Sequence, residues 1–454
     1  MDSDAEFSSK PNSIISRREF FKLSGAAAVA AGAGSIANPA QAAALLSGRG
    51  DTASLPKANG PRLVIVGAGT SGLTIAKYAK INYPDFDVVL VEKRDMYASC
   101  FSSNLLYADL IDLEFLANHS FLDAARNGKY IFFNATCTGL DRANRRLATD
   151  QGEIAYDYLV LAPGIDYDYS RINVNDVDTE TALRRDYPAG WIKPTEHITI
   201  RNKVRDFKGG VFIQTVPSGN YRCLPSPYER ACMIAAYFKK KGIKGKVVLL
   251  DSNPDITIKA EGFHAAFNEL YKGYIEYNPS VDIKGVDVEK KLIRTAFDSY
   301  AFDDAAIYPG IRASKLIEDF GLLSPSSTQK EANIDIRKYN IIGDERVYVT
   351  GDARPMGYSK SGNTANTEGK YVAKVLAAHA QGKTIEWESP RTLCFSMVNA
   401  KPMEAISVDA NYTYFPEKHA FGFSNTTKMD QHRDQEKGRA TLGWAQSLYA
   451  DLFS

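Results

Sequence analysis

Five cysteines are the residues of this chain best suited to redox or nucleophilic chemistry. They are Cys100, Cys137, Cys223, Cys232 and Cys394. None of them forms a Cys-x-x-Cys pair and the six histidines are scattered, which argues against a zinc site or an attached c-type haem. A chain of 454 residues can build a large core without disulfide staples. Because the number is odd, at least one thiol has no second cysteine to pair with.

A glycine-rich turn offers a second kind of chemistry, the binding of a phosphate group. Residues 62–66 form a short β-branched run, which ends in Gly67-Ala68-Gly69-Thr70-Ser71-Gly72, and residues 73–81 have the pattern of a helix. The glycines allow the backbone to turn tightly and to approach a pyrophosphate at the helix N-terminus. Residues 87–92 form a second strand, and Glu92 at its end is placed to bind a ribose hydroxyl. These features predict a dinucleotide-binding unit.

Two later segments favour FAD as the dinucleotide. Residues 158–164 read as a strand that runs into a Pro-Gly turn at Gly164, as where the chain leaves a flavin domain. Residues 347–353 read as another strand, which ends in Gly351-Asp352-Ala353 and is followed by a predicted helix over 364–381. In flavoproteins with two dinucleotide domains, the Asp of such a motif binds the ribityl chain. Gly164, Gly351 and Asp352 are therefore candidate flavin-binding residues.

The segment between these two parts contains a related unit that lacks the glycine motif. We predict a strand over 210–215, a helix over 228–241 and a second strand over 246–251. The loop 216–225 has no Gly-x-Gly-x-x-Gly, and its prolines Pro217 and Pro225 would remove amide donors from a phosphate cradle. The sequence therefore predicts no NADH site here, and an electron partner other than a nicotinamide.

The net charge and the N-terminal segment narrow the possible partners. Fifty-five Lys and Arg against 54 Asp and Glu give a net charge of +1, so no basic excess points to nucleic acid. Arg17-Arg18 precede an uncharged stretch over 23–37 and the small residues Ala40-Gln41-Ala42. This order predicts a twin-arginine signal peptide, cleaved near Ala42, and a periplasmic protein. The uncharged stretch is short and rich in Gly and Ala, so we expect no stable membrane insertion.

The cysteines and their neighbours resemble those of a known family. The matching segments are Tyr97-Ala98-Ser99-Cys100, Arg222-Cys223-Leu224-Pro225, Lys360-Ser361-Gly362 and Thr392-Leu393-Cys394-Phe395-Ser396. On these residues the chain resembles the flavoprotein subunit of flavocytochrome c sulfide dehydrogenase, within the sulfide:quinone reductase and disulfide-reductase superfamily. The resemblance extends from residue 64 to the C-terminal residues 444–453 and so covers nearly the whole chain after the predicted signal peptide.

The resemblance implies a role for several residues. Cys100 matches the cysteine that binds FAD covalently through the 8α-methyl group, and Cys223 and Cys394 match a redox-active disulfide over the flavin. Glu229 has the spacing of the family's candidate acid or base, although a Glu in the first turn of a helix also stabilises the helix dipole. Lys360 matches a lysine near the flavin. Cys137 and Cys232 match no functional position, and we expect them to be buried thiols.

The resemblance also implies an α/β fold. It consists of two Rossmann-like dinucleotide-binding-type domains, as in the glutathione-reductase-like FAD/NAD(P) fold, and a C-terminal interface domain. The expected ranges are the signal peptide 1–42, a linker 43–60, the FAD-binding domain 61–180 and 301–385, the second domain 181–300, and the C-terminal domain 386–454. Residues 440–453 have helical apolar spacing, which predicts an amphipathic helix docked on the protein.

The implied function is the oxidation of sulfide to sulfur or polysulfide. Hydrosulfide would open the Cys223–Cys394 disulfide, and the electrons would pass through FAD to a c-type cytochrome, either a partner subunit or a soluble protein. An alternative is a sulfide:quinone reductase, which has the same disulfide and flavin but a quinone acceptor. The missing second glycine motif disfavours a pyridine-nucleotide disulfide reductase. A flavin-bearing accessory protein of a sulfur-oxidation system, with little turnover of its own, is a further alternative.

Overall fold

A six-stranded sheet forms the first structural layer of the chain. The computed structural model describes residues 52–454, so the predicted signal peptide lies outside the described residues. In spatial order the strands are β19 (Asn340–Ile341), β20 (Asp344–Val349), β9 (Tyr158–Leu161), β1 (Arg62–Val66), β2 (Asp87–Glu92) and β5 (Ile131–Asn134). All neighbours pair in parallel except β19 and β20. β1 and β2 are apolar and buried along nearly their whole length, as expected for parallel strands covered on both faces.

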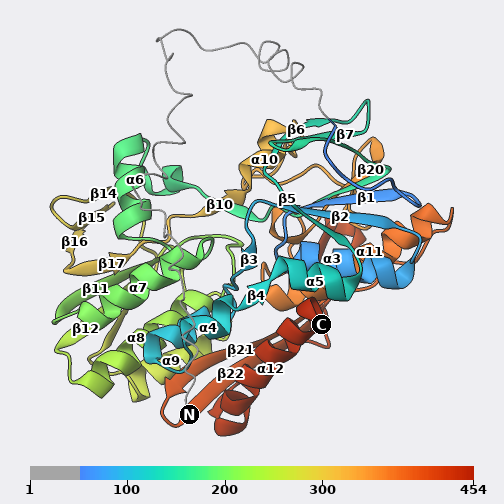
Figure 1. Ribbon diagram of the computed structural model, residues 1–454. Helices are drawn as coiled ribbons and strands as arrows, with labels where there is room; N and C mark the ends of the chain where they lie inside the picture. Colours follow the sequence, from blue (N-terminus) through green and yellow to red (C-terminus); the bar gives the residue numbers. More distant parts are fainter. Residues whose placement is uncertain (1–51) are drawn as a thin grey trace, which may run out of the picture. The chain divides into compact units, whose positions relative to one another are not determined.

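Helices from opposite ends of the chain pack together beside this sheet. They are α3 (Thr70–Asn82), α5 (Phe121–Gly128) and α11 (Gly362–Ala380), and α3 contacts α11 directly (Figure 1). Gly369 of α11 permits this close packing, because a Cβ there would lie 3.0 Å from the Cβ of Thr74. β1 and α3 begin a structural unit that β20 and α11 complete, although almost 300 residues lie between the first pair of elements and the second.

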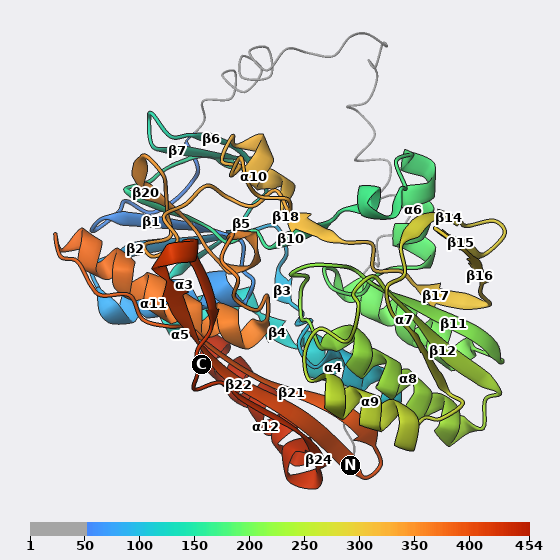
Figure 2. The same cartoon turned by 180° about the vertical axis from the view of Figure 1, so that it is seen from behind.

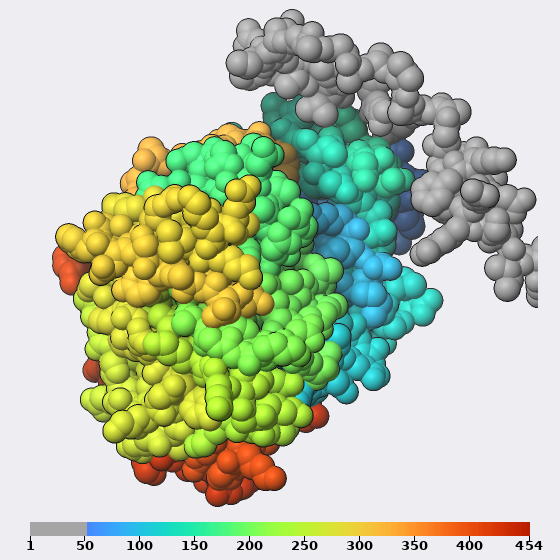
Figure 3. All heavy atoms as spheres, turned by 90° about the vertical axis from the view of Figure 1, so that its left-hand side faces the viewer, coloured from blue at the N-terminus to red at the C-terminus, as the bar shows by residue number. Residues whose placement is uncertain are grey.

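A second parallel sheet is built from the middle of the chain. Its strands, in spatial order, are β13 (Ile275–Asn278), β12 (Gly245–Asp251), β11 (Gly210–Val216) and β17 (Asp304–Ala306). Helices α7 (Pro194–Asp206), α8 (Ser226–Lys241) and α9 (Ala260–Glu269) accompany it, and this part of the chain forms the green and yellow surface in Figure 3. Because β17 lies past residue 300, the second sheet extends beyond the range predicted for the second domain.

Short antiparallel strands connect and flank the two sheets. β10 (Ile165–Tyr167) follows β9, and it pairs with β18 (Ile311–Ala313), where the chain returns from β17. β6 (Cys137–Asp141), β7 (Arg146–Thr149) and β8 (Gly152–Ala155) form a three-stranded sheet. β14 (Ile283–Asp287), β15 (Leu292–Thr295) and β16 (Ser299–Ala301) form another. The paired strands β10 and β18 therefore mark where the part of the chain that builds the second sheet (the second unit) is inserted into the part that builds the first sheet (the first unit).

The C-terminal part bridges the two units. It contains the long hairpin β21 (Arg391–Ala400) and β22 (Met403–Phe415), then β23 (Ala420–Phe423), β24 (Lys428–Asp434) and α12 (Gln435–Phe453). β21 contacts α11 of the first unit and α8 of the second, and the hairpin runs beneath both sheets in two opposite views (Figures 1 and 2). A residue on β21 can therefore meet residues from both units.

The C-terminal helix docks on the protein through one face. Ala445, Leu448, Tyr449 and Leu452 are buried, as the apolar spacing predicts, while Leu442 is half-buried. None of the helices within residues 52–454 combines the length and the hydrophobicity needed to cross a membrane. The predicted α/β fold with two Rossmann-like units and a C-terminal domain is confirmed. Since residues 52–454 pack as one compact unit, the domain boundaries stay predictions.

Candidate functional site

The glycine turn after β1 adopts the conformation that a phosphate cradle requires. Gly67 has a φ of 98°, and a Cβ there would lie 2.4 Å from the carbonyl oxygen of Ala162. A Cβ at Gly72 would lie 1.9 Å from the carbonyl oxygen of Gly67, whereas one at Gly69 would meet nothing within 4 Å. The first turn of α3 carries no acidic residue, and Gly69 provides no side-chain cap. The amide groups at this helix end are therefore open to an anion, which fits a dinucleotide pyrophosphate.

Glu92 lies at the end of β2, beside this turn. Its carboxylate accepts hydrogen bonds from the N–H of Ala68 at 2.9 Å and from Nε of Arg94 at 2.9 Å. Burial alone would raise the pKa of Glu92, but the bonds from Arg94 and Ala68 hold it below its ordinary value. Glu92 and Gly67 line a cavity of about 770 Å³. An ionised acceptor at this place fits the adenosine ribose of FAD.

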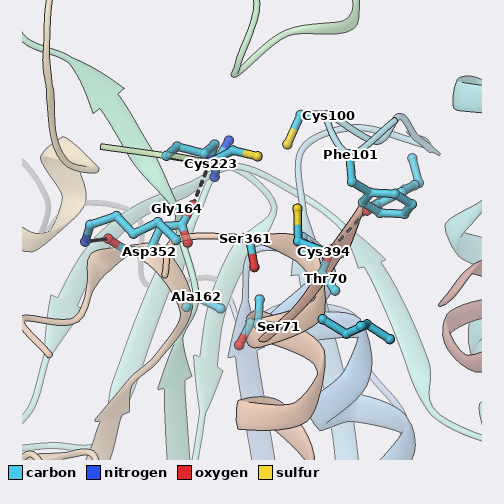
Figure 4. A pocket seen from close by; sticks show the side chains of 18 of the residues that line it. Thr70, Ser71, Cys100, Phe101, Ala162, Gly164, Cys223, Asp352, Ser361 and Cys394 are labelled. Atoms are coloured by element: carbon cyan, nitrogen blue, oxygen red, sulfur yellow. Dashed lines mark hydrogen bonds and ion pairs between the residues drawn. The ribbon is translucent and has the colours of Figure 1, made fainter. Parts of the chain in front are cut away.

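A second cavity, of about 750 Å³, begins at Gly69 and contains three of the five cysteines. Cys100 follows β3 (Met96–Tyr97), Cys223 precedes α8, and Cys394 lies on β21. Their sulfurs point toward a common space in Figure 4. The two cavities meet the glycine turn at Gly67 and Gly69, so an elongated dinucleotide can extend along the turn from one to the other. We call the second space the cysteine cavity.

Cys223 and Cys394 approach each other from different units of the fold. Cys223 has a left-handed φ of 58°, and its N–H donates to the carbonyl oxygen of Lys360 at 2.9 Å. Both thiols are free in this structure and half-buried. Burial raises the pKa of both, and the negative charge of Glu229 raises them further. The structure thus brings together two residues that lie 171 positions apart, as the predicted redox pair requires; a disulfide between them stays a prediction.

Cys100 sits in the loop before the short helix η1 (Ser103–Ala108). The hydroxyl of Ser103 donates to the carbonyl oxygen of Cys100 at 2.7 Å, which fixes the loop backbone. Burial raises the pKa of the Cys100 thiol, and the positive charge of Arg222 opposes this effect. Cys100 therefore faces the cavity where a flavin ring would lie, with a cation nearby that favours its thiolate.

Arg222 is a residue of the site that the sequence did not single out. Its Nε donates to Asp352 Oδ2 at 2.6 Å, and its Nη1 donates to the carbonyl oxygen of Trp191 at 2.5 Å. Although burial opposes ionisation, Arg222 holds the pKa of Asp352 below its ordinary value. The position of Arg222 next to Cys223 was the available clue, but sequence alone could not show that it reaches Asp352. The cavity wall therefore carries an anchored positive charge.

The other predicted flavin residues also line the cysteine cavity. Gly164 and Gly351 adopt left-handed φ values of 76° and 68°. Lys360 lines the cavity too, but its Nζ donates to Glu331 Oε1 at 2.6 Å and to the carbonyl oxygen of Asp352 at 2.8 Å. Burial lowers the pKa of Lys360, against the effect of Glu331. Its ammonium thus neutralises Glu331 and braces the Asp352 segment.

Glu229 lies in the first turn of α8, close to the cysteine pair. Its Oε2 accepts from Asn104 Nδ2 at 2.7 Å, and its Oε1 accepts from the N–H of Met397 at 2.7 Å. The side chain is 8% exposed, and burial raises its pKa above the ordinary value. A raised pKa makes this carboxyl a stronger base than an exposed glutamate, as a general base requires.

The two remaining cysteines lie outside the cysteine cavity. Cys232 is completely buried in α8, as predicted. Cys137 on β6 is half-buried, lines the cavity that contains Glu92, and has its pKa raised by burial to about 12. Neither thiol is therefore poised to react. Within residues 52–454, no cluster of three or more His, Cys, Asp or Glu could hold a metal ion.

Three family models match successive parts of the chain. The central domain of "Sulfide dehydrogenase [flavocytochrome c] flavoprotein chain" matches residues 198–309, and "Flavocytochrome c sulphide dehydrogenase, flavin-binding" matches residues 388–453. "Pyridine nucleotide-disulphide oxidoreductase" matches residues 61–187. These ranges correspond to the second unit, the C-terminal part and the first unit of the fold.

Similar proteins extend these matches over most of the chain. The mitochondrial sulfide:quinone oxidoreductase of Mus musculus is 24% identical over 351 residues, which cover 75% of this chain and 72% of the relative. A type II NADH:quinone oxidoreductase of Staphylococcus haemolyticus is 22% identical over 368 residues, which cover 73% and 87%. The crystal structure of the sulfide:quinone oxidoreductase from Aquifex aeolicus has a TM-score of 0.71 at 15% identity and covers 86% of this chain and 91% of its own. The structural match shows the shared fold.

Proposed function

We propose that this chain, which belongs to the family of flavocytochrome c sulfide dehydrogenase flavoproteins, oxidises hydrogen sulfide through a Cys223–Cys394 disulfide and passes the electrons to a c-type cytochrome. The observation that carries the proposal is the cysteine cavity. It collects Cys100, Cys223 and Cys394 from three separate segments at the end of a dinucleotide-binding turn. This arrangement supports a reaction in which a disulfide and a flavin act together.

The chain has the residues needed to hold FAD. The open N-terminus of α3 and the glycine turn would bind the pyrophosphate, and Glu92 would bind the adenosine ribose. The segment Gly351–Asp352, which lines the cysteine cavity, would hold the flavin end of the molecule. When bound, FAD supplies an acceptor that takes up two electrons together and releases them singly. Cys100 would anchor the flavin covalently, since it faces the cavity and Arg222 favours its thiolate.

Cys223 and Cys394 would perform the first chemical step as a disulfide. Hydrosulfide attacks one sulfur, the S–S bond breaks, and the electron pair of that bond goes to the other sulfur, which becomes a thiolate. The attacked cysteine then carries the new sulfur as a persulfide. Burial of both residues in a cavity limits competing exchange with bulk thiols.

Arg222 and Glu229 would prepare the cavity for this step. The guanidinium of Arg222, anchored by Asp352, attracts the hydrosulfide anion to the cavity. The carboxylate of Glu229 would accept a proton from the incoming sulfur species, because burial raises its pKa and so makes it a stronger base. Arg222 would thus guide the anion into the cavity, and Glu229 would act as a general base.

The acceptor is the point at which a second candidate function differs. The chain contains no Cys-x-x-Cys-His haem motif, so we infer that the haem belongs to a partner cytochrome. A quinone acceptor is the alternative, favoured by the likeness to the mouse sulfide:quinone oxidoreductase. The twin-arginine pattern at Arg17-Arg18 supports a periplasmic protein, where c-type cytochromes are available. A third possibility, an accessory flavoprotein, predicts negligible turnover with either acceptor.

Steady-state assays on the purified protein distinguish these functions. We expect sulfide-dependent reduction of cytochrome c without added quinone; turnover only with a quinone would show the alternative, and no turnover with either would favour the accessory protein.

Denaturation of the protein in acid or detergent tests whether Cys100 binds the flavin covalently. The yellow colour should remain with the chain, and in Cys100→Ser it should separate from it.

A further inference from the structure

Lys259 is a buried lysine that has no role in the reaction proposed above. It caps α9 at its N-terminus, it is 2% exposed, and its φ of 58° lies in the left-handed region, which is unfavourable for residues with a Cβ. Its Nζ donates to Ser396 Oγ at 2.7 Å, and it forms no ion pair with any carboxylate of residues 52–454. Its charge lowers the pKa of the Glu229 carboxyl, but the two groups do not pair directly. A buried ammonium without a paired carboxylate is costly, so its place calls for a physical reason.

Ser396 connects this ammonium to Cys394. The two residues lie two positions apart on β21, so their side chains share one face of the strand. Ser396 lowers the pKa of the Cys394 thiol. A hydroxyl has one proton and two lone pairs, so Ser396 can accept from Lys259 while its own proton stays free for an anionic sulfur that forms at Cys394. Ser396 is itself 1% exposed, which keeps water away from its bond with Lys259.

The charges around the two cysteines differ. Burial raises the pKa of the Cys394 thiol, Lys259 and Ser396 lower it, and the carboxylate of Glu229 raises it. Burial also raises the pKa of Cys223, and there the negative charges of Cys394, Glu229 and Cys100 add to the increase while Ser226 opposes it. Lys259 is thus the cation that lowers the pKa of Cys394, whereas negative charges dominate the influences on Cys223 besides burial.

We propose that Lys259 is a positioning residue, which orients Ser396 and holds a positive charge against Cys394 so that an anionic sulfur is stabilised there. The proposal rests on the disulfide reaction proposed above. If hydrosulfide attacks Cys223, the electron pair of the broken S–S bond makes Cys394 a thiolate. If it attacks Cys394, that residue carries the persulfide, whose S–H proton passes to Glu229, and Cys223 becomes the thiolate. An anion forms at Cys394 in both cases.

The test measures the acidity of Cys394 directly and needs no sulfide. In the flavin-loaded protein with Cys223→Ser, no Cys223–Cys394 disulfide can form, and alkylation of Cys394 by iodoacetamide is followed against pH with peptide mass spectrometry. Adding Lys259→Met should move the midpoint up by at least one pH unit, which is about a tenfold slower reaction below the midpoint. Ser396→Ala should move it in the same direction.

Two matched variants serve as controls. Lys203→Met removes a partly buried lysine that pairs with Asp304 beside the second sheet, and it should leave the midpoint unchanged. Lys259→Arg keeps the charge and should restore most of the original midpoint. An unchanged midpoint in Lys259→Met with flavin retained would overturn the proposal; if that variant does not fold, an unchanged midpoint in Ser396→Ala would do so. A shifted midpoint in a protein that sulfide does not reduce would instead refute the proposed function.

Discussion

The two strand–turn–helix units of this chain have the same arrangement and different chemistry. In the first unit, β1 leads through glycines into α3, whose N-terminus has no side-chain cap and no acidic residue in its first turn. In the second unit, β11 leads into α8 through a loop that contains Cys223, with Pro225 at the N-cap and Glu229 in the first turn. The first helix end therefore suits an anion such as a pyrophosphate, whereas the second opposes one.

The acids at the ends of the second strands show the same contrast. Glu92 lines a cavity, where it can bind a ribose. Asp251 is completely buried, and its carboxylate accepts hydrogen bonds from the hydroxyls of Tyr228 at 2.7 Å and Tyr277 at 3.0 Å and from the N–H of Asn253 at 2.9 Å. Glu92 also accepts hydrogen bonds within the protein, from Ala68 and Arg94, so the two acids differ in that only Glu92 lies at a cavity wall. The first unit can thus offer a carboxylate to a ribose, whereas the second unit keeps its carboxylate in the core and contributes a cysteine and Glu229 near the cavity.

The loop of the second unit is also fastened to the first. The N–H of Cys223 donates to the carbonyl oxygen of Lys360, and Arg222 pairs with Asp352. These bonds make the loop a wall of the cysteine cavity. A loop without the glycine motif can therefore bring a cysteine to the dinucleotide site of the other unit.

The largest effect should follow from replacing Cys223, which lies in the loop between β11 and α8 of the second unit. Cys223→Ser should lower sulfide-dependent cytochrome c reduction by about 10³-fold or more, because no disulfide can form for hydrosulfide to open. The flavin content should stay near that of the wild type, since the first unit is unchanged. Cys232→Ala, a cysteine of α8 outside the cavity, is the matched control and should keep its activity. Wild-type turnover in Cys223→Ser would show that the loop of the second unit takes no part in the reaction.

Glu229 tests the acidic first turn of α8. Glu229→Gln should reduce turnover by about 10²-fold, the usual contribution of a general base. Burial raises the pKa of Glu229, so the wild-type rate should be lost as the pH falls through a value above 4.5, where the carboxylate becomes protonated. The variant should lack this inflection and keep the one that comes from sulfide itself. Identical pH–rate profiles would assign Glu229 a structural role.

Gly72→Ala tests the glycine turn of the first unit. The new Cβ would overlap the carbonyl oxygen of Gly67, so the turn must shift and the pyrophosphate cradle is lost. We expect the purified protein to contain less than about one tenth of the wild-type flavin, as measured by absorbance after denaturation. Gly443→Ala, in an open position of α12, should have no effect on flavin content.

The smallest effects should separate Glu92 from Asp251. Glu92→Gln should lower the flavin content of the purified protein by up to about tenfold, because it alters a ligand contact, and it should also lower the free energy of unfolding, because it disturbs the bonds from Ala68 and Arg94. Asp251→Asn should retain flavin and lower the free energy of unfolding by about 1–3 kcal/mol, because it disturbs buried hydrogen bonds. Chemical denaturation and the flavin absorbance of the purified protein check both variants. Equal effects of the two on flavin would mean that both units bind a dinucleotide.

Much of the fold was predictable because the chain's apolar runs are distinct. The strand over 62–66 agrees with β1, and the helix predicted over 364–381 agrees with α11 within two residues. The helix after the glycine turn begins at Thr70, three residues before the predicted start, because the turn residues themselves join it. β10, β17 and β18 were not predicted, since strands of three residues leave too little pattern.

The site was predictable only where the cysteines and glycines identify it. The three cysteines expected at the flavin do line one cavity, together with Gly164, Gly351 and Asp352. Arg222 and Lys259 could not be assigned from sequence, because an isolated Arg or Lys is usually a solvated surface residue. Their roles depend on contacts with Asp352 and Ser396, which only the folded chain brings near.

Anaerobic titration of the purified, oxidised protein with sulfide tests whether the disulfide and the flavin react together. The absorbance of the oxidised flavin should disappear with about one equivalent of sulfide per flavin, since the oxidation of one sulfide to sulfane sulfur releases one electron pair, which the flavin accepts while the disulfide is re-formed. NADH added in the same way should leave the spectrum unchanged, because the loop of the second unit lacks the glycine motif. A flavin that sulfide does not reduce, or that NADH does, would contradict the account.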